Sequence, residues 1–205
     1  NHSIEVKSLT SDFTYTKSHM NFLNTKLETE TSSILTDLIF TYNREDFSDF
    51  NNVVNIEADV EKADLSLTDL KKFYNELGTD DVLHFTTKVT GKLNNLVAHN
   101  LKLVSDKNAI INGTLNFKNS FNQENGFSLD GNLTNLTSDY NHLKILLPDV
   151  LGKTLPSSFE KFGRFTINGK IYLTENIINA QVTLNTEIGT SISDLELTNI
   201  STIDE

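Results

Sequence analysis

The chain has 205 residues, a formal net charge of −11 and a pI of 4.8, so it is strongly acidic and long enough for one sizeable domain. Its lysines and arginines form no cluster, which argues against a nucleic-acid binder and against a polybasic membrane patch. Cysteine is absent, which excludes thiol catalysis, disulfides and thiolate metal sites, and no apolar run is long enough to span a bilayer.

In chain order, the sequence predicts about ten or eleven β-strands. The first stretches, 4–15, 20–28 and 34–42, alternate apolar and polar residues less cleanly than the later ones. Clear alternation follows at 54–60, 83–89, 109–117, 165–173 and 178–184. Successive side chains of a strand point to opposite faces, so each segment has one apolar and one polar face. This favours an antiparallel sheet with one solvated side, and an apolar share of 37% suits one covered face better than a two-sided core.

Two segments interrupt the alternation and predict short amphipathic helices. The first, 66–78, opens with a serine cap and a carboxylate three residues later, and its apolar side contains Leu67, Leu70, Phe73, Tyr74 and Leu77. The second begins near Ser138 and has the same offsets at Tyr140, Leu143, Leu146, Leu147, Val150 and Leu151. Pro148 should kink this helix, and another turn is expected around 157–162. We expect the helical insertions, about 66–78 and 138–162, to dock on the apolar wall.

A motif of the form apolar-x-Gly-x-apolar occurs four times, at Gly91, Gly113, Gly131 and Gly169. In each copy the glycine takes the place of an apolar side chain on the apolar face. A glycine within a strand permits a bend, a bulge or the close approach of another group. The repeated motif therefore predicts a sheet that curls around its apolar face, and ordinary kinks in a β-sandwich explain it equally well.

Residues with the spacing of known catalytic or metal sites are missing. The five histidines, His2, His19, His84, His99 and His142, form no pair with metal-ligand spacing, and His84 is expected on the polar face. There is no Gly-x-Ser-x-Gly elbow and no glycine-rich phosphate loop. The acidic stretch 44–50 lacks the alternating oxygen ligands of a calcium loop, so a solvated turn is the better interpretation. The sequence therefore predicts neither an enzyme nor a cofactor.

Five segments together resemble one protein family: "DFSDFNNVVNIEADVEKADLSLTDLKKFYNELG", "VTGKLNNLVAHNLKL", "INGTLNF", "LDGNLTNLTSDYNHLKILLPDVL" and "FGRFTINGKIYL". Their order and spacing resemble the TamB-like proteins of Bacteroidota, within the AsmA-like superfamily of bridge-type lipid-transfer proteins. The resemblance covers Leu9 to about Ile200. It implies a sheet folded lengthwise into a trough, called a β-taco or repeating β-groove, with an apolar interior. It gives no catalytic residues.

The same resemblance implies a setting and partners. Such proteins cross the periplasm, are anchored in the inner membrane outside a segment of this kind, and are implicated in phospholipid movement between the two membranes. They are also linked to outer-membrane protein assembly with a BamA/TamA-type barrel as partner. The helical insertions leave open whether the trough is open or plugged.

The predicted fold is thus mainly β, an elongated antiparallel β-groove with two short amphipathic helices, forming one segment over 1–205. Water-exposed acyl chain costs about 0.8 kcal/mol per methylene, and a continuous apolar wall removes most of that cost without gripping any atom. The expected function is a periplasmic conduit that passively guides phospholipid. The residues expected to line the groove against acyl chains are Val54, Ile56, Val60, Leu83, Phe85, Val89, Leu93, Ile111, Leu115, Phe117, Leu129, Leu133, Ile167, Ile171, Val182 and Leu184.

Two other functions fit the same pattern. One is an assembly module whose sheet edges template the strands of nascent barrel proteins by β-augmentation. The other is a ligand-free structural or adhesive β-sandwich, because a closed sandwich shows the same one-sided alternation.

Overall fold

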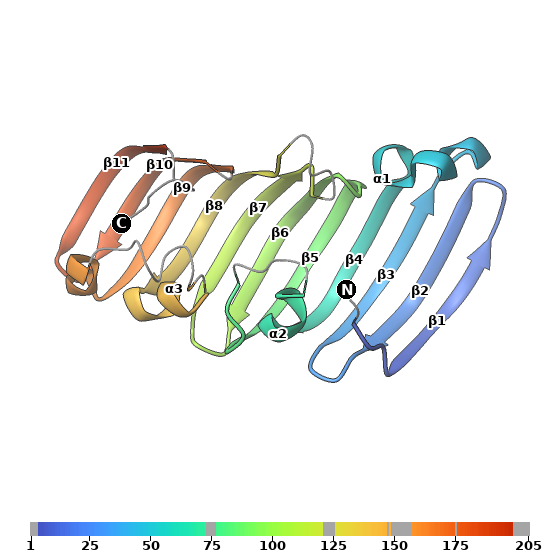
Figure 1. The fold of residues 1–205 in the computed structure, drawn as a ribbon, viewed down its shortest axis with the longest axis horizontal. Helices are drawn as coiled ribbons and strands as arrows, with labels where there is room; N and C mark the ends of the chain where they lie inside the picture. Colours follow the sequence, from blue (N-terminus) through green and yellow to red (C-terminus); the bar gives the residue numbers. More distant parts are fainter. Residues whose placement is uncertain are drawn as a thin grey trace.

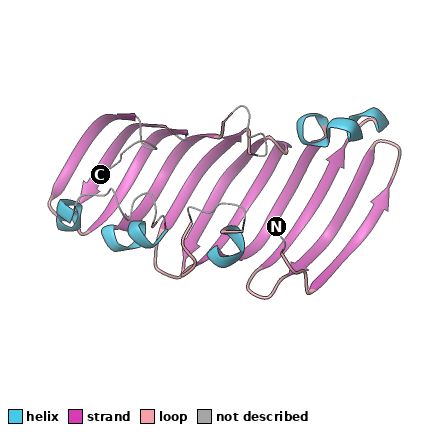
Figure 2. Ribbon diagram, viewed as in Figure 1, coloured by secondary structure: helices cyan, strands magenta, loops and turns pink. Residues whose placement is uncertain are grey.

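The structure is a computed structural model that describes residues 4–72, 77–120, 126–146, 148, 157–174 and 176–198. Eleven strands form one antiparallel sheet, in which every strand pairs with the next strand along the chain (Figure 1, Figure 2). The strands are β1 Ser8–Tyr15, β2 His19–Glu28, β3 Ser33–Thr41, β4 Asn55–Ser66, β5 Val82–Lys92, β6 Asn95–Ser105, β7 Ile110–Lys118, β8 Ser128–Asp139, β9 Arg164–Thr174, β10 Ile177–Thr186 and β11 Gly189–Thr198. The predicted elongated, mainly β fold and its number of strands are confirmed.

The sheet is a single open layer with β1 and β11 as its edges (Figure 1). Within the described residues no second sheet faces it, so the expected alternative of a β-sandwich architecture is wrong. A sandwich would need the strand order to divide between two layers, whereas here each hairpin adds the next strand to the same growing edge.

Short helices lie at the ends of the strands. They are η1 Arg44–Asp49, α1 Phe50–Val53, α2 Leu67–Leu70, α3 Tyr140–Leu146 and η2 Ser157–Phe162. The α1 helix lies at one rim of the sheet, and α2 and α3 lie at the opposite rim, beside the apolar wall on which the helices were expected to dock (Figure 1).

The two predicted helices are shorter than expected in the described residues. The α2 helix is a single turn capped by Ser66, whose hydroxyl accepts a hydrogen bond from the Thr68 backbone N at 3.2 Å. The α3 helix ends at Leu146, before Pro148, whose ring cannot continue the helical hydrogen-bond ladder. Residues 71–72, 77–78 and 148, also predicted as helical, are not in a helix, and 73–76, 147 and 149–156 lie outside the described residues. The expected extra turn at 157–162 is confirmed by η2.

The strand register brings the apolar side chains onto one surface, which we call the apolar face. Residues paired directly across an antiparallel sheet share a face, and so do alternate residues of one strand. One row of register partners crosses all eleven strands: Phe13, Phe22, Leu38, Ala58, Val89, Ala98, Leu115, Gly131, Ile171, Ala180 and Leu195. A second row on the same face consists of Tyr15, Met20, Phe40, Ile56, Gly91, Leu96, Phe117, Leu129, Leu173 and Ile178.

A third apolar row follows on the other side of a line of β-bulges. It consists of Leu9, Leu27, Ile34, Ala63, Phe85, Leu103, Ile111, Leu136, Ile167 and Leu184. The bulges lie in β2, β4, β6 and β8, and the bulge residues Asn24 and Asn100 have φ angles of 50° and 49°. Each bulge bends its strand, so a line of bulges across the sheet makes it groove-like along its length.

Side chains of the odd-numbered strands β1, β3 and β5 form hydrogen bonds with the bulged segments of the neighbouring strands β2, β4 and β6. The Ser11, Thr36 and Thr87 hydroxyls donate to the backbone oxygens of Leu23, Asp59 and His99, at 3.2, 2.9 and 3.0 Å respectively. These bonds satisfy carbonyl groups that the irregular ladder leaves free, so a polar side chain is tolerated on the apolar face. At the corresponding positions β7 and β9 have Gly113 and Gly169.

Two of the four glycine motifs show why the sequence needs glycine on the apolar face. Gly169 has a φ of 137°, and an added Cβ would lie 2.2 Å from the Gln181 backbone oxygen, so a side chain is excluded by the neighbouring strand. Gly131 has no such backbone constraint, and an added Cβ would instead meet the Ile171 side chain at 2.7 Å. The position of the motif on the apolar face is confirmed.

Candidate functional site: the apolar face

The apolar face contains all but two of the residues that the sequence predicts to line a groove. The exceptions lie outside the strands: Val54 directly precedes β4 and is 0% exposed, and Leu93 lies in the turn between β5 and β6. Ile56 and Leu133 are buried, at 6 and 3% exposure, and the other predicted residues are half-buried. The face is therefore a continuous apolar surface that no second layer covers in the described part of the chain.

The dimensions of this surface follow from strand geometry. Neighbouring strands are about 4.8 Å apart, so eleven strands make a surface about 50 Å long. At about 3.3 Å per residue, the strands of 8 to 12 residues give it a width of about 26 to 40 Å. A contiguous apolar surface of this size exceeds what soluble proteins normally expose, and such surfaces usually bind a ligand or a partner.

The first three strands contribute apolar residues that the sequence-based list omits, notably Phe22, Leu38 and Phe40. In β2 the signal is weak because the bulge shifts the alternation: Phe22 shares the apolar face with Leu27, five positions further on. In β3 it is weak because Leu35 and Ile39 place apolar residues on the opposite face as well.

The aromatic residues of the apolar face gather at the β1 end. Ring centroids lie 4.8 Å apart for Phe13 and Phe22, 6.0 Å for Phe22 and Phe40, and 5.6 Å for Phe40 and Phe50 of α1. These distances fit favourable aromatic pairs. From β6 to β10 the same rows consist mainly of Leu, Ile and Ala, so one end of the surface is mainly aromatic and the other mainly aliphatic.

The opposite face is polar. On it His84 lies between two carboxylates, with its Nδ1 2.7 Å from Asp64 and its Nε2 2.8 Å from Asp106. Hydrogen bonds to Asp64 and then Asp106 raise the pKa of His84. The predicted position of His84 on the polar face is confirmed, and the arrangement is an ordinary charged bridge that joins β4, β5 and the residue after β6.

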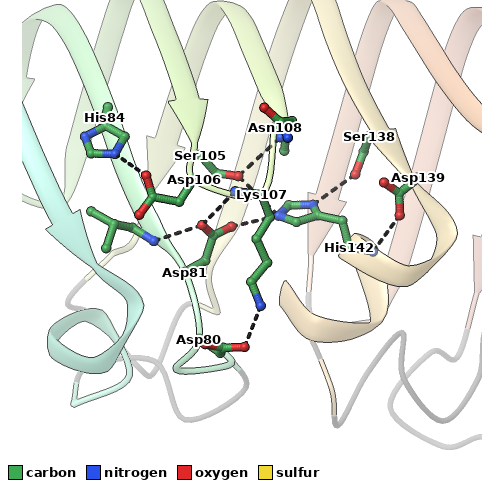
Figure 3. A network of polar contacts seen from close by, with 12 residues as sticks. Asp80, Asp81, His84, Ser105, Asp106, Lys107, Asn108, Ser138, Asp139 and His142 are labelled. Carbon is green, nitrogen blue, oxygen red and sulfur yellow. Dashed lines mark hydrogen bonds and ion pairs between the residues drawn. The ribbon is translucent and has the colours of Figure 1, made fainter.

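At the rim, a buried cluster joins α3 to the start of β5 (Figure 3). The His142 Nε2 donates to Asp81 at 2.8 Å, and its Nδ1 lies 3.0 Å from the Ser138 hydroxyl. The side chains of Asp81 and His142 are 0 and 4% exposed. Burial raises the pKa of Asp81, but hydrogen bonds from His142, Ser105 and the Val82 backbone N outweigh burial and lower it.

Ser138, His142 and Asp81 are also the residue types of a serine-hydrolase triad. A nucleophile must meet its substrate, yet the Ser138 and Ser105 hydroxyl groups belong to residues only 3 and 2% exposed. We interpret the cluster as a structural one that holds α3 against the start of β5.

A second buried carboxylate, Asp69, binds α2 to the turn between β2 and β3. Its Oδ2 accepts hydrogen bonds from the Thr29, Thr31 and Ser32 hydroxyls at 2.7, 2.8 and 2.8 Å. Burial alone would raise the pKa of Asp69, but these bonds and one from Lys72 lower it to about 2. In the sequence Asp69 has only the signature of a helix cap, and no local pattern points to its contacts with Thr29, Thr31 and Ser32.

We expect Asp69→Asn to lower the free energy of unfolding at pH 7 by about 2 kcal/mol, because the pKa falls by nearly two units from its ordinary value on folding. A depressed pKa contributes stability above the unfolded pKa near 3.8, and that stability is lost as the pH falls toward 2. Urea unfolding of both proteins between pH 7 and pH 2 measures this. The difference between them should shrink across the acidic range, and a constant difference would contradict the assignment.

Among the described residues, no group of three or more His, Asp or Glu side chains is placed to hold a metal ion. In that part of the chain no helix combines the length and apolarity needed to cross a membrane. Comparison with known proteins finds no matching family, no matching curated protein and no matching solved structure.

Proposed function

We propose that the chain is a conduit segment that passively guides phospholipid along its apolar face. The observation that carries this proposal is the row of apolar register partners that runs without a charged residue from Phe13 to Leu195 across all eleven strands. A hydrocarbon chain lying along such a row meets apolar side chains, aromatic and then aliphatic, and no charged group in the row holds it at one position.

The energetic argument concerns the whole lipid. Two acyl chains crossing water would face a penalty of tens of kcal/mol, at about 0.8 kcal/mol per methylene. An apolar surface open on one side removes most of this penalty and leaves the headgroup in water. The periplasmic location, the anchor in the inner membrane and a BamA/TamA-type barrel as partner belong to this proposal through the family resemblance.

We expect Ile111→Glu to reduce bound phospholipid at least tenfold, because a carboxylate would interrupt the third apolar row near the middle of the sheet. Native mass spectrometry of protein purified from phospholipid-containing cells measures the bound lipid. Asn112→Glu is the matched control, since the neighbouring side chain lies on the polar face and adds the same charge. Equal lipid occupancy in both folded variants would refute the proposal.

The alternative of strand templating draws support from the open edges of β1 and β11. Photoreactive groups at Val89 and Leu93 distinguish the two functions in cells that express the protein. Lipid adducts at Val89, on the apolar face, favour the conduit, and polypeptide adducts favour an assembly module.

A further inference from the structure

The outer edge of β1 exposes more apolar surface than the strands behind it. Leu9, Phe13 and Tyr15 are 58, 54 and 63% exposed, and all three point to the apolar face. Just before β1, the Lys7 backbone N donates to the Glu28 oxygen of β2 at 2.8 Å, so Lys7 too is held on the β2 side and not at the outer edge. No strand of the described chain pairs with the outer side of β1, and a free edge of this kind is a template for another strand.

The number of strands limits how copies of the chain can join. In an antiparallel sheet of eleven strands, β1 and β11 run in the same direction. Joining β11 to the β1 of another copy, with both apolar faces on one side, therefore gives a parallel pair that repeats as an open filament. If the two copies join antiparallel with both apolar faces on the same side of the joined sheet, β1 must pair with β1 or β11 with β11. Such a joint closes as a two-fold dimer.

Of the two edges, β1 is better suited to this joint. At β11 the apolar face is partly polar, because Ser191 and Ser193 lie opposite Leu184 and Val182, whereas Leu195 continues the first row. The β11 edge also has two acidic residues, Asp194 and Glu196, whereas β1 has only Asp12. Charge on an edge strand opposes edge-to-edge pairing, so β11 is protected where β1 is not.

We propose that two copies of the chain pair β1 with β1, antiparallel, about a two-fold axis at Ser11. This register places Leu9 opposite the partner's Phe13 on the apolar face and Thr10 opposite the partner's Asp12 on the polar face. No like charges oppose each other, and β1 is regular because the neighbouring bulge lies in β2. The apolar face then continues across the joint. The proposal goes beyond lipid guidance and does not depend on it.

Single cysteines test the register directly, because the natural chain has none. Directly opposed residues of antiparallel strands have Cα atoms about 4.5 to 5.5 Å apart, within the range of a disulfide. Under mild oxidation Ser11→Cys should form a covalent dimer, and Ser193→Cys, at the β11 edge, should stay monomeric. Equal cross-linking of both variants, or none with Ser11→Cys, would overturn the proposal.

A second measurement keeps the test independent of oxidation. We expect Phe13→Lys to raise the dissociation constant of the dimer by about tenfold or more, measured by sedimentation, because the charge replaces an apolar contact made twice in the joint. Leu195→Lys, the same change in the same row at the other edge, should leave it unchanged. The joint would be ruled out if the unaltered chain sedimented as a monomer, or if Leu195→Lys raised the dissociation constant more than Phe13→Lys does.

Discussion

Replacing Asp81 by alanine should lower the free energy of unfolding by about 3 to 5 kcal/mol, one of the two largest effects that we expect for a single substitution. The carboxylate is 0% exposed, and its removal leaves the equally buried His142 without its charged partner. Two backbone N–H groups, of Val82 and Lys107, also lose their acceptor, at 2.9 and 3.3 Å. Urea unfolding followed by circular dichroism measures the loss.

Asp80→Ala is the matched control for this prediction. Asp80 is the preceding residue and has the same side chain, but it is 86% exposed and forms an ion pair with Lys107. Exposed ion pairs contribute about 0 to 1 kcal/mol, so its removal should have little effect. If the two variants were equally stable, the buried cluster would not fasten α3 to β5.

Replacing Gly169 by alanine should destabilise the fold by about 3 kcal/mol or more, and the variant should unfold at markedly lower urea concentration. A residue other than glycine is strained at a φ of 137°, by about 1 to 3 kcal/mol. The added Cβ would also lie 2.2 Å from the Gln181 backbone oxygen, which β10 holds in the ladder. The strand pair must therefore separate locally.

Substitutions at two other glycines separate the two causes of the destabilisation expected for Gly169→Ala, backbone strain and steric contact. Gly189→Ala has a φ of 151° but no atom within 4 Å of the new Cβ, so it should show only the conformational cost. Gly131→Ala meets the Ile171 side chain, which can rotate, so it should cost less than Gly169→Ala. If Gly189→Ala were as damaging as Gly169→Ala, steric contact with β10 would not be the cause.

Much of the candidate site could be predicted because it depends on local alternation. Ile167 and Ile171 share a face in any regular strand, whatever surrounds it. The interactions that fasten the helices could not be predicted in this way. His142 lies 61 positions from Asp81, and Asp69 lies 40 from Thr29, so no local pattern connects the partners. Both contacts exist only because neighbouring hairpins bring the ends of distant strands to the same rim.

The amino-acid sequence by itself determined that the strands have one apolar and one polar face, because alternation along a strand is a property of the backbone. It also determined where Gly169 interrupts the apolar row. Only the tertiary structure decided that the apolar face is one open surface and not the filled interior of a sandwich. The same alternation serves both architectures, and the difference lies in whether each strand pairs with its neighbour in sequence or crosses to a second layer. Here each one pairs with its neighbour, from β1 to β11.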